Sequence, residues 1–276
     1  LAPGSQATVM RFDGNAWVST GNGGFSTRST NRTKIAFDDS GMLYLVYEDP
    51  FSGGKITVEK YDGTSWSTVG IRGFSAGQSA YPAIAFDGST PYVAFQDATN
   101  SQRTTVMRFD GSAWVVVGTP GFSSGVSEFQ NLVISNSGTP SVAYKDNGLR
   151  GAIVVKQYDG NTWNTLPNVG LAATDIFSNS LAVDNSGTLY LLFQDLSRGR
   201  KASVQKFNGN SWVFEGSRAF SSNSAGQINL AFDKSGIPYA GFIDGSNLNK
   251  ATVMKLVSPI VSFGSGVSAN TPGTYQ

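Results

Sequence analysis

The octapeptide MRFDGNAW at Met10–Trp17 decides the fold, because it returns at a regular spacing along the chain. The further copies are EKYDGTSW (Glu59–Trp66), MRFDGSAW (Met107–Trp114), KQYDGNTW (Lys156–Trp163) and QKFNGNSW (Gln205–Trp212). Together they contain all five tryptophans of the chain, at positions 17, 66, 114, 163 and 212. The period is therefore about 49 residues, a length typical of propellers and solenoids.

Each repeat reads as four short strands separated by turns. In one complete unit the strands are AIAF (83–86), PYVAFQ (91–96), TTVMRF (104–109) and WVVVG (114–118). The turn between the last two strands is Asp-Gly, which favours a tight hairpin because glycine readily adopts a positive φ. No segment keeps a 3.6-residue apolar period, so the sequence predicts almost no helix.

Four antiparallel strands in each repeat predict an all-β fold, a β-propeller of four-stranded antiparallel blades. The first strand of each unit would lie at the axis, where small residues such as Ala36 and Ala85 suit the crowding of the blades. A parallel β-solenoid is the main rival, but it uses shorter repeats without tight Asp-Gly hairpins. The propeller is the better interpretation.

The repeat divides the whole chain, 1–276, as one propeller domain. We expect an outer hairpin at 7–19, blades at about 35–69, 83–117, 131–166, 180–215 and 229–263, and a tail at 264–276. This division contains one more outer hairpin than inner hairpins. It favours a six-bladed ring with one blade incomplete on this chain, and five blades are the alternative. The missing strands would come from a longer chain or from a neighbouring molecule.

The composition excludes several classes of function. The net charge is +1 and only 14% of the residues are charged, which gives no support for a nucleic-acid partner or a membrane surface. The chain has no histidine and no cysteine, so it lacks the commonest general base, the commonest metal ligand and any disulfide. No apolar stretch is long enough to span a membrane. We expect no cofactor and no metal site.

The inner hairpins, LAVDNSGTLYLLF (181–193) and LAFDKSGIPYAGF (230–242), resemble the repeat of NHL and related bacterial propellers. The outer hairpins, such as KYDGTSWSTVG (60–70), resemble the blades of Kelch-like and Asp-box propellers. This resemblance implies a secreted or cell-surface bacterial protein that takes part in adhesion or carbohydrate contact. The sialidase Asp-box begins with a serine that is absent here, and with four glutamates the arginine triad and Tyr/Glu pair of a sialidase cannot be assembled.

Two recurring residues are interpreted as structural rather than ligand-binding. In the Asp-Gly hairpin the aspartate caps the turn and the tryptophan packs on the blade, so five identical lectin pockets are the weaker interpretation. The carboxylate that ends the second strand of each unit is expected to open the following loop as an Asx-type turn. The residues are Trp17, Trp66, Trp114, Trp163 and Trp212, and Asp49, Asp97, Asp146, Asp195 and Asp244.

A binding surface is predicted where the repeats vary. Because strand directions alternate, the loops after the second strand and the crossings between blades share one face of the disc. Twelve of the 20 lysines and arginines lie in or beside these loops. Loops host function on a constant scaffold, so this face is expected to contact an acidic or hydroxyl-rich partner. The candidate ligand-binding residues are Arg28, Arg32, Arg72, Arg103, Arg150, Arg198, Arg200 and Arg218.

These observations predict an extracellular, non-catalytic binding or adhesion propeller of a bacterial surface protein, with a polysaccharide or glycan as partner. Near-identical blades argue against an enzyme, because a single active site breaks the symmetry. A structural protomer that associates with itself through the incomplete blade, building a filament or coat, is the alternative. A glycoside-active enzyme is a weaker alternative.

Overall fold

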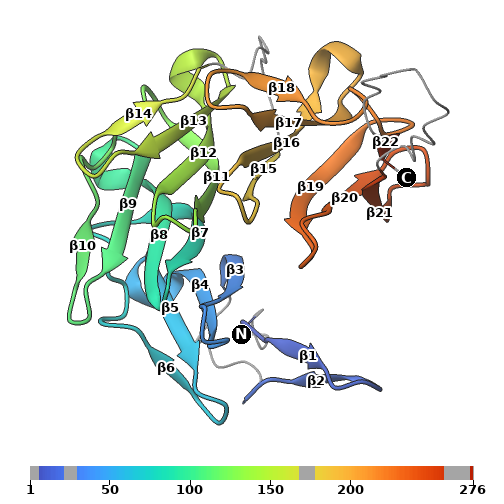
Figure 1. Ribbon diagram of the computed structural model, residues 1–276. Helices are drawn as coiled ribbons and strands as arrows, with labels where there is room; N and C mark the ends of the chain where they lie inside the picture. Colours follow the sequence, from blue (N-terminus) through green and yellow to red (C-terminus); the bar gives the residue numbers. More distant parts are fainter. Residues whose placement is uncertain (1–5, 22–29, 168–177, 258–273, 276) are drawn as a thin grey trace, which may run out of the picture. The chain divides into compact units, whose positions relative to one another are not determined.

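The computed structural model describes residues 6–21, 30–167, 178–257 and 274–275. These parts of the chain fold as antiparallel strands, with single 3₁₀ turns as their helical content (Figure 1). No helix in these parts is long and apolar enough to cross a bilayer. The expectation of an all-β protein is confirmed.

Five four-stranded sheets follow one another along the sequence, each with its strands in the order of the chain. The first sheet contains β3 (Asn31–Phe37), β4 (Leu43–Asp49), β5 (Lys55–Tyr61) and β6 (Trp66–Thr68); the second contains β7 (Ser79–Asp87), β8 (Thr90–Asp97), β9 (Arg103–Phe109) and β10 (Trp114–Val116); the third contains β11 (Ser127–Ile134), β12 (Pro140–Asp146), β13 (Ala152–Tyr158) and β14 (Trp163–Thr165). The fourth contains β15 (Asn179–Val183), β16 (Leu189–Asp195), β17 (Lys201–Phe207) and β18 (Trp212–Phe214), and the fifth contains β19 (Ala225–Phe232), β20 (Pro238–Asp244), β21 (Lys250–Val257) and β22 (Thr274–Tyr275). Each sheet is one blade.

The expected count of six blades is wrong, because the described chain forms five. The residues expected to begin a sixth blade form β1 (Met10–Phe12) and β2 (Trp17–Ser19), which pair only with each other as a two-stranded sheet. An outer hairpin repeats the sequence signal of a blade but brings no inner strands with it. Counting outer hairpins therefore overestimated the number of blades.

The end of the chain also differs from the predicted division. The fourth strand of the last blade was expected within 229–263, but residues 258–263 lie outside the described part. The described partner of β21 is instead β22, with Leu256 opposite Tyr275 and Val257 opposite Thr274. Part of the predicted tail, 264–276, thus supplies the edge strand of the fifth sheet.

The Asp-Gly hairpins fold locally for the expected reason. In the turn between β5 and β6, the carboxylate of Asp62 accepts hydrogen bonds from the backbone N–H groups of Thr64 and Ser65, at 2.8 and 2.7 Å. Gly63 follows with a φ of 98°, which a side chain would oppose. The same backbone bonds hold the pKa of the Asp62 carboxyl below its usual value. The turn is closed by its own residues and needs no distant partner.

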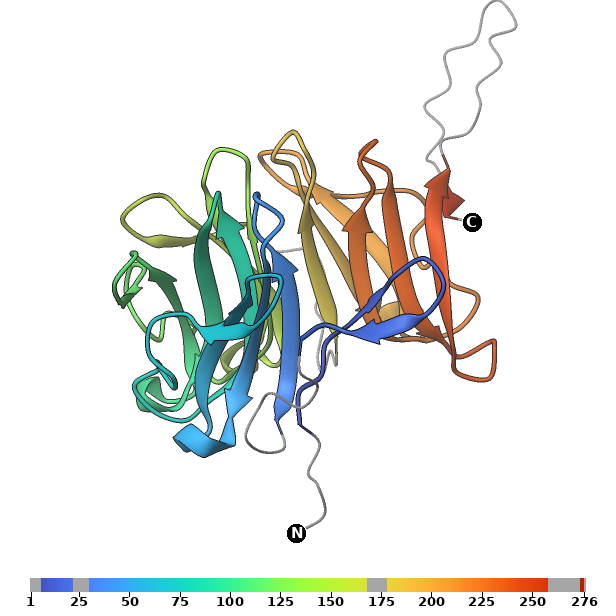
Figure 2. The same ribbon diagram turned by 90° about the horizontal axis from the view of Figure 1, so that it is seen from below.

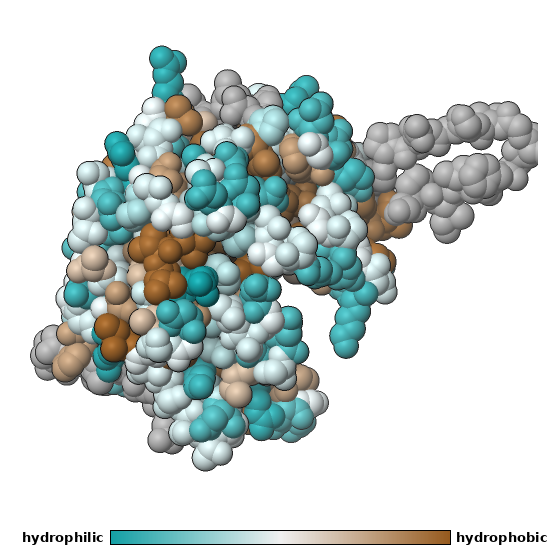
Figure 3. Space-filling view, turned by 60° about the vertical axis from the view of Figure 1, so that its left-hand side comes forward, coloured by the Kyte–Doolittle hydropathy of each residue, from teal (hydrophilic) through white to brown (hydrophobic). Residues whose placement is uncertain are grey.

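The chain divides into two compact units, 1–134 with 158–163 and 135–157 with 164–276. In the first unit an apolar cluster joins the first and second sheets and includes Val46, Val58, Val93 and Phe95, all 1% exposed or less. In the second unit a corresponding cluster joins the fourth and fifth sheets. Within each unit the sheets lie side by side (Figure 2), and these clusters bury the apolar face of one sheet against the next. On the surface drawn in Figure 3, hydrophilic and neutral side chains predominate and apolar groups form small patches.

Candidate functional site

Trp114 and Trp163 of the repeat are packed between neighbouring sheets, whereas Trp17 is 66% exposed. The indole N–H of Trp114 donates to the carbonyl of Val69, which follows the last strand of the preceding sheet, at 3.0 Å. The indole ring also stacks on Phe74 of the recurring Gly-Phe-Ser segment, with centroids 4.0 Å apart. Trp163 repeats both contacts, with Val117 and Phe122. These two indoles are less than 10% exposed, so they have no open face on which a sugar could stack.

A glycine lies in close contact with each of these two indoles, Gly70 beside Trp114 and Gly118 beside Trp163. Gly70 has a φ of 71°, and a Cβ placed on it would lie 3.2 Å from the indole of Trp114 and 2.8 Å from the ring of Phe109. The fourth sheet departs from this pattern, because Pro167 stands at the corresponding position and proline fixes φ near −65°. The indole N–H of Trp212 is correspondingly buried without a hydrogen-bond partner among the described residues.

The recurring aspartates tie three segments together. The carboxylate of Asp49 accepts from the backbone N–H of Phe51, so it caps the 3₁₀ turn η1 (Pro50–Ser52). It also accepts from the Thr57 hydroxyl on β5, at 3.0 Å, and from the guanidinium of Arg72 in the crossing to the next blade. Burial raises the pKa of Asp49, but the bonds from Arg72 and Thr57 outweigh it and the pKa lies below its usual value.

The same arrangement returns in the other blades with local variation. Asp195 is held by Arg218 and by the Ser197 hydroxyl, and these bonds, against the effect of burial, keep its pKa low. The remaining carboxylates bind the backbone N–H two residues on, at the start of η2 (Ala98–Asn100), at the start of η3 (Asn147–Leu149) and in the loop after β20; they belong to Asp97, Asp146 and Asp244. This is the capping geometry that the sequence suggested. Among the described residues no group of three or more acidic side chains is placed to hold a metal ion.

The predicted loop-face arginines fall into different settings. Arg28 lies outside the described residues, and Arg72 and Arg218 are bound to the aspartates above. Arg103 is exposed at the first residue of β9, opposite Asp97 in the ladder. Arg150 and Arg200 have left-handed backbones at the ends of the 3₁₀ turns η3 and η4 (Leu196–Arg198). Arg198 and Arg218 line a surface hollow of about 380 Å³ together with Lys201 and Ala219.

Strand β3 brings the remaining arginine, Arg32, to a β-bulge that recurs in the first strand of several blades. The ladder shifts register between Asn31 and Lys34, and again at the corresponding places in β7 and β19. The residue inside each bulge has a positive φ although it is not glycine. These residues are Arg32, Tyr81 and Gln227, and Phe129 at the corresponding position of β11 has the same backbone; their φ values lie between 42° and 57°. Strained bulges of this kind cluster at functional sites.

In the first unit the bulge side chains lie against one another. The guanidinium of Arg32 lies over the ring of Tyr81, 4.2 Å from its centroid, and the Tyr81 ring meets Phe129 edge-on at 5.1 Å. Glu48 binds both residues of this contact. Its carboxylate accepts hydrogen bonds from the guanidinium of Arg32 at 2.9 and 3.0 Å and from the backbone N–H of Tyr81 at 3.0 Å. We call these four residues the bulge cluster.

The bulge cluster combines chemistry that binds hydroxyl-rich ligands. The Arg32 side chain is 45% exposed, while the side chain of its partner Glu48 is 11% exposed, so the cation stands at the surface on a buried anion. Although burial lowers it, the Glu48 hydrogen bond raises the pKa of Arg32, which keeps the guanidinium charged. A charged bidentate pair beside partly exposed aromatic rings offers hydrogen bonds and an apolar face at once.

Sequence reasoning named Arg32 but missed Tyr81, Phe129 and Glu48. Tyr81 and Phe129 stand two or three residues before the apolar core of their strands, where a regular strand would point them elsewhere. The one signal available was that these positions differ between otherwise similar repeats: Arg, Tyr, Phe and Gln. Only the bulge brings them to the same side.

No family model matches the chain, and no curated protein matches it. The resemblance to NHL, Kelch-like and Asp-box repeats therefore stays a prediction. Solved structures do match. The Aleuria aurantia lectin, in complex with Fucα1-6GlcNAc, is 17% identical with a TM-score of 0.57, over 82% of this chain and 74% of that one.

A second lectin and a sialidase are also similar in structure. The SapL1 lectin, in complex with α-methyl fucoside, is 16% identical over 81% of this chain and 76% of that one, with a TM-score of 0.56. A Hadza microbial sialidase is 16% identical over 83% of this chain and 56% of that one, with a TM-score of 0.55. At such low identity the likeness is one of fold: the chain is built as a β-propeller of four-stranded antiparallel blades.

Proposed function

We propose that the protein is a carbohydrate-binding propeller and that the bulge cluster is a binding site for a neutral or acidic sugar. The observation that carries the proposal is the contact of the Arg32 guanidinium with the Tyr81 ring and of that ring, edge-on, with Phe129, while Glu48 holds Arg32 and the Tyr81 backbone. The blades share their turns, caps and core residues, but they differ here. Variation confined to a fixed and strained backbone position is what a ligand site on a repeated scaffold requires.

The chemistry of a sugar fits this set. A pyranose ring presents apolar C–H groups on one face, which pack on an aromatic ring such as Tyr81 or Phe129. Neighbouring hydroxyls accept from a guanidinium, and Arg32, held in place by Glu48, supplies that group beside the rings. The fold is shared with two fucoside-binding lectins, which supports the proposal.

The fold by itself decides neither binding nor catalysis, because the similar structures include a sialidase. We place the protein among binders because Glu48, the acidic residue of the bulge cluster, is already engaged by Arg32 and by the backbone of Tyr81. We also propose an extracellular or cell-surface location, as the resemblance to bacterial surface propellers implies.

The test is a glycan array followed by titration of the best ligand, with methyl α-L-fucoside and sialyllactose as defined probes. Tyr81→Ala removes the central ring, and Arg32→Ala removes the cation; each is expected to weaken binding about tenfold or more, since each loses an anchor worth 1–3 kcal/mol. Arg103→Ala is the matched control, an exposed arginine of the same unit outside the cluster. It should leave the affinity unchanged.

Two results would overturn the proposal. Glycan binding that survives both cluster variants would place the site elsewhere, and an array without any bound glycan would remove the function. Sugar release from sialyllactose or a fucoside, measured in the same samples, would make the protein an enzyme instead.

A further inference from the structure

The hairpin β1–β2 occupies the place of a blade's outer half. Residues just before β1, Ala7 and Val9, are buried against Leu43, Leu45 and Tyr47 of β4. On the other strand, the carbonyl of Thr20 accepts the indole N–H of Trp66, as Val69 does for Trp114 in the next interval. The hairpin therefore packs on the first sheet as the outer hairpins of the first and second sheets pack on the sheets that follow them.

The inner half of that blade is not filled by any described strand. In each complete sheet the third strand has the second strand along its inner edge, as β4 lies along β5. Within the described residues β1 has only β2, so the backbone of Met10–Phe12 presents an unpaired edge. Met10 and Phe12 are 48% and 56% exposed. An open edge of this kind is a template for another strand.

On the first sheet, the residues of β3 that face this missing inner half are exposed. Ile35 is 56% exposed, whereas Ile84, its counterpart in the second sheet, is 8% exposed because the first sheet covers it. Phe37 is 62% exposed. Its counterpart Phe86 lies against Tyr44 of the preceding sheet, with ring centroids 4.6 Å apart.

A second pair in the chain repeats this ring contact. The ring of Phe232 in the fifth sheet lies against the ring of Tyr190 in the fourth, with centroids 4.9 Å apart. Tyr44 and Tyr190 are both the second residue of the second strand in their sheets, β4 and β16. The structure thus shows twice which side chain covers the position of Phe37: a tyrosine from an inner hairpin.

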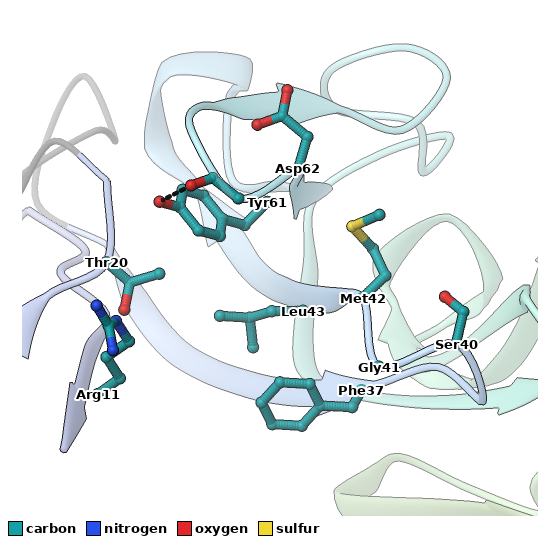
Figure 4. A pocket seen from close by; sticks show the side chains of 10 residues that line it. Arg11, Thr20, Phe37, Ser40, Gly41, Met42, Leu43, Tyr61 and Asp62 are labelled. Atoms are coloured by element: carbon teal, nitrogen blue, oxygen red, sulfur yellow. Dashed lines mark hydrogen bonds between the residues drawn. The ribbon is translucent and has the colours of Figure 1, made fainter. Parts of the chain in front are cut away.

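Two hollows mark the open position. One, of about 380 Å³, lies between the hairpin and the first sheet, and Figure 4 shows Phe37, Leu43 and Met42 on its sheet side and Arg11 and Thr20 on its hairpin side. The other, of about 150 Å³, continues along the start of β1; it is lined by Ala7, Thr8, Val9, Met10, Thr33, Ile35 and Leu45. We call the edge of Met10–Phe12, with Ile35, Phe37 and Leu43, the inner-hairpin seat.

We propose that the inner-hairpin seat binds a two-stranded β-hairpin of the chain's own inner-hairpin type. Its second strand adds antiparallel to β1, and its tyrosine covers Phe37. The chain's five inner hairpins are each held inside a complete four-stranded sheet, so the occupant is a further hairpin of this pattern. The site is separate from the bulge cluster, and it recognises a strand edge rather than a sugar.

The other blades predict the register of the bound hairpin. In the fourth sheet Tyr190 pairs with Lys206 and Leu191 pairs with Gln205. Lys206 and Gln205 correspond in the repeat to Arg11 and Met10. The added tyrosine should therefore lie opposite Arg11, and the residue after it opposite Met10.

A synthetic peptide of residues 179–195, labelled with a fluorophore, is the probe, and its binding to the complete chain is followed by anisotropy. Binding is expected to weaken about tenfold or more with Phe37→Ala, because the tyrosine then loses its apolar partner. A peptide with Tyr190→Ala should weaken equally. Ile71→Ala is the matched control, since Ile71 is 70% exposed on the same unit but outside the seat.

The absence of native cysteine allows a direct test of register. The protein with Met10→Cys and a peptide with Leu191→Cys should form a disulfide, because paired Cα atoms in neighbouring strands lie within reach of one. A peptide with Leu192→Cys should not, since its side chain points to the opposite face.

An isolated hairpin is only marginally stable, so a second arrangement removes that difficulty. The same 17 residues, fused through a flexible linker ahead of Leu1, should raise the melting temperature and protect the amides of Met10–Phe12 from hydrogen exchange. If the peptide does not bind and the fusion protects nothing, the inference is wrong. Concentration-dependent self-association that Phe37→Ala abolishes would assign the seat to a second copy of the chain and overturn the hairpin assignment.

Discussion

Replacing Gly70 by alanine tests how tightly the sheets are joined. Gly70 has a φ of 71°, so the left-handed backbone alone costs a side chain about 1–2 kcal/mol. The new Cβ would also lie 2.8 Å from Phe109 and 3.2 Å from the Trp114 indole, and overpacking of this kind adds about 1–3 kcal/mol. We therefore expect Gly70→Ala to lower the free energy of unfolding by about 2–5 kcal/mol.

A second glycine of the chain serves as a matched control for the cost of a side chain on a left-handed backbone. Gly53 has a φ of 73°, and a Cβ there would meet nothing within 4 Å. Gly53→Ala should therefore show the backbone cost alone, about 1–2 kcal/mol. Urea unfolding followed by tryptophan fluorescence measures both variants. Equal destabilisation by the two substitutions would refute the close packing of Trp114 between the sheets.

The remaining predictions concern hydrogen bonds and charge. Trp114→Phe should destabilise more than Trp212→Phe, by about 1 kcal/mol in urea unfolding, because the Trp114 N–H bonds to Val69 while the Trp212 N–H has no described partner. Similar losses would contradict this reasoning. Because the native pKa of Asp49 lies below its usual value of 3.8, the carboxylate stabilises the fold fully above that pH and loses its contribution as the pH falls through the native pKa. Asp49→Asn should therefore destabilise at neutral pH, by about 2 kcal/mol since Arg72 loses the carboxylate to which it is hydrogen-bonded, and should flatten the loss of stability in acid; an unchanged acid profile would argue against this role.

The local architecture could be read from the repeat, because its determinants are local. An Asp-Gly turn closes through backbone bonds within four residues, as Asp62 shows, and the alternation around it makes strands whatever the rest of the chain does. The spacing of the tryptophans then implies identical sheets packed in series. The capping geometry of Asp49 follows from the same local chemistry.

Contacts between segments far apart in the sequence were decided only by the tertiary structure. The motif at Met10–Trp17 does not show which strands its outer hairpin pairs with, and the structure shows that, among the described residues, β1 pairs only with β2.

The bulge cluster needed a register shift before it could form. Arg32 and Tyr81 are 49 residues apart, one repeat period, so the sequence places them at equivalent positions of neighbouring sheets; the periodicity does not show that both strands bulge there and bring the two side chains into contact. Turns and strands depend on neighbouring residues, whereas the proposed site is assembled by packing between sheets. This is the physical reason why the sequence determined the blade and only the tertiary structure brought the residues of the proposed site together.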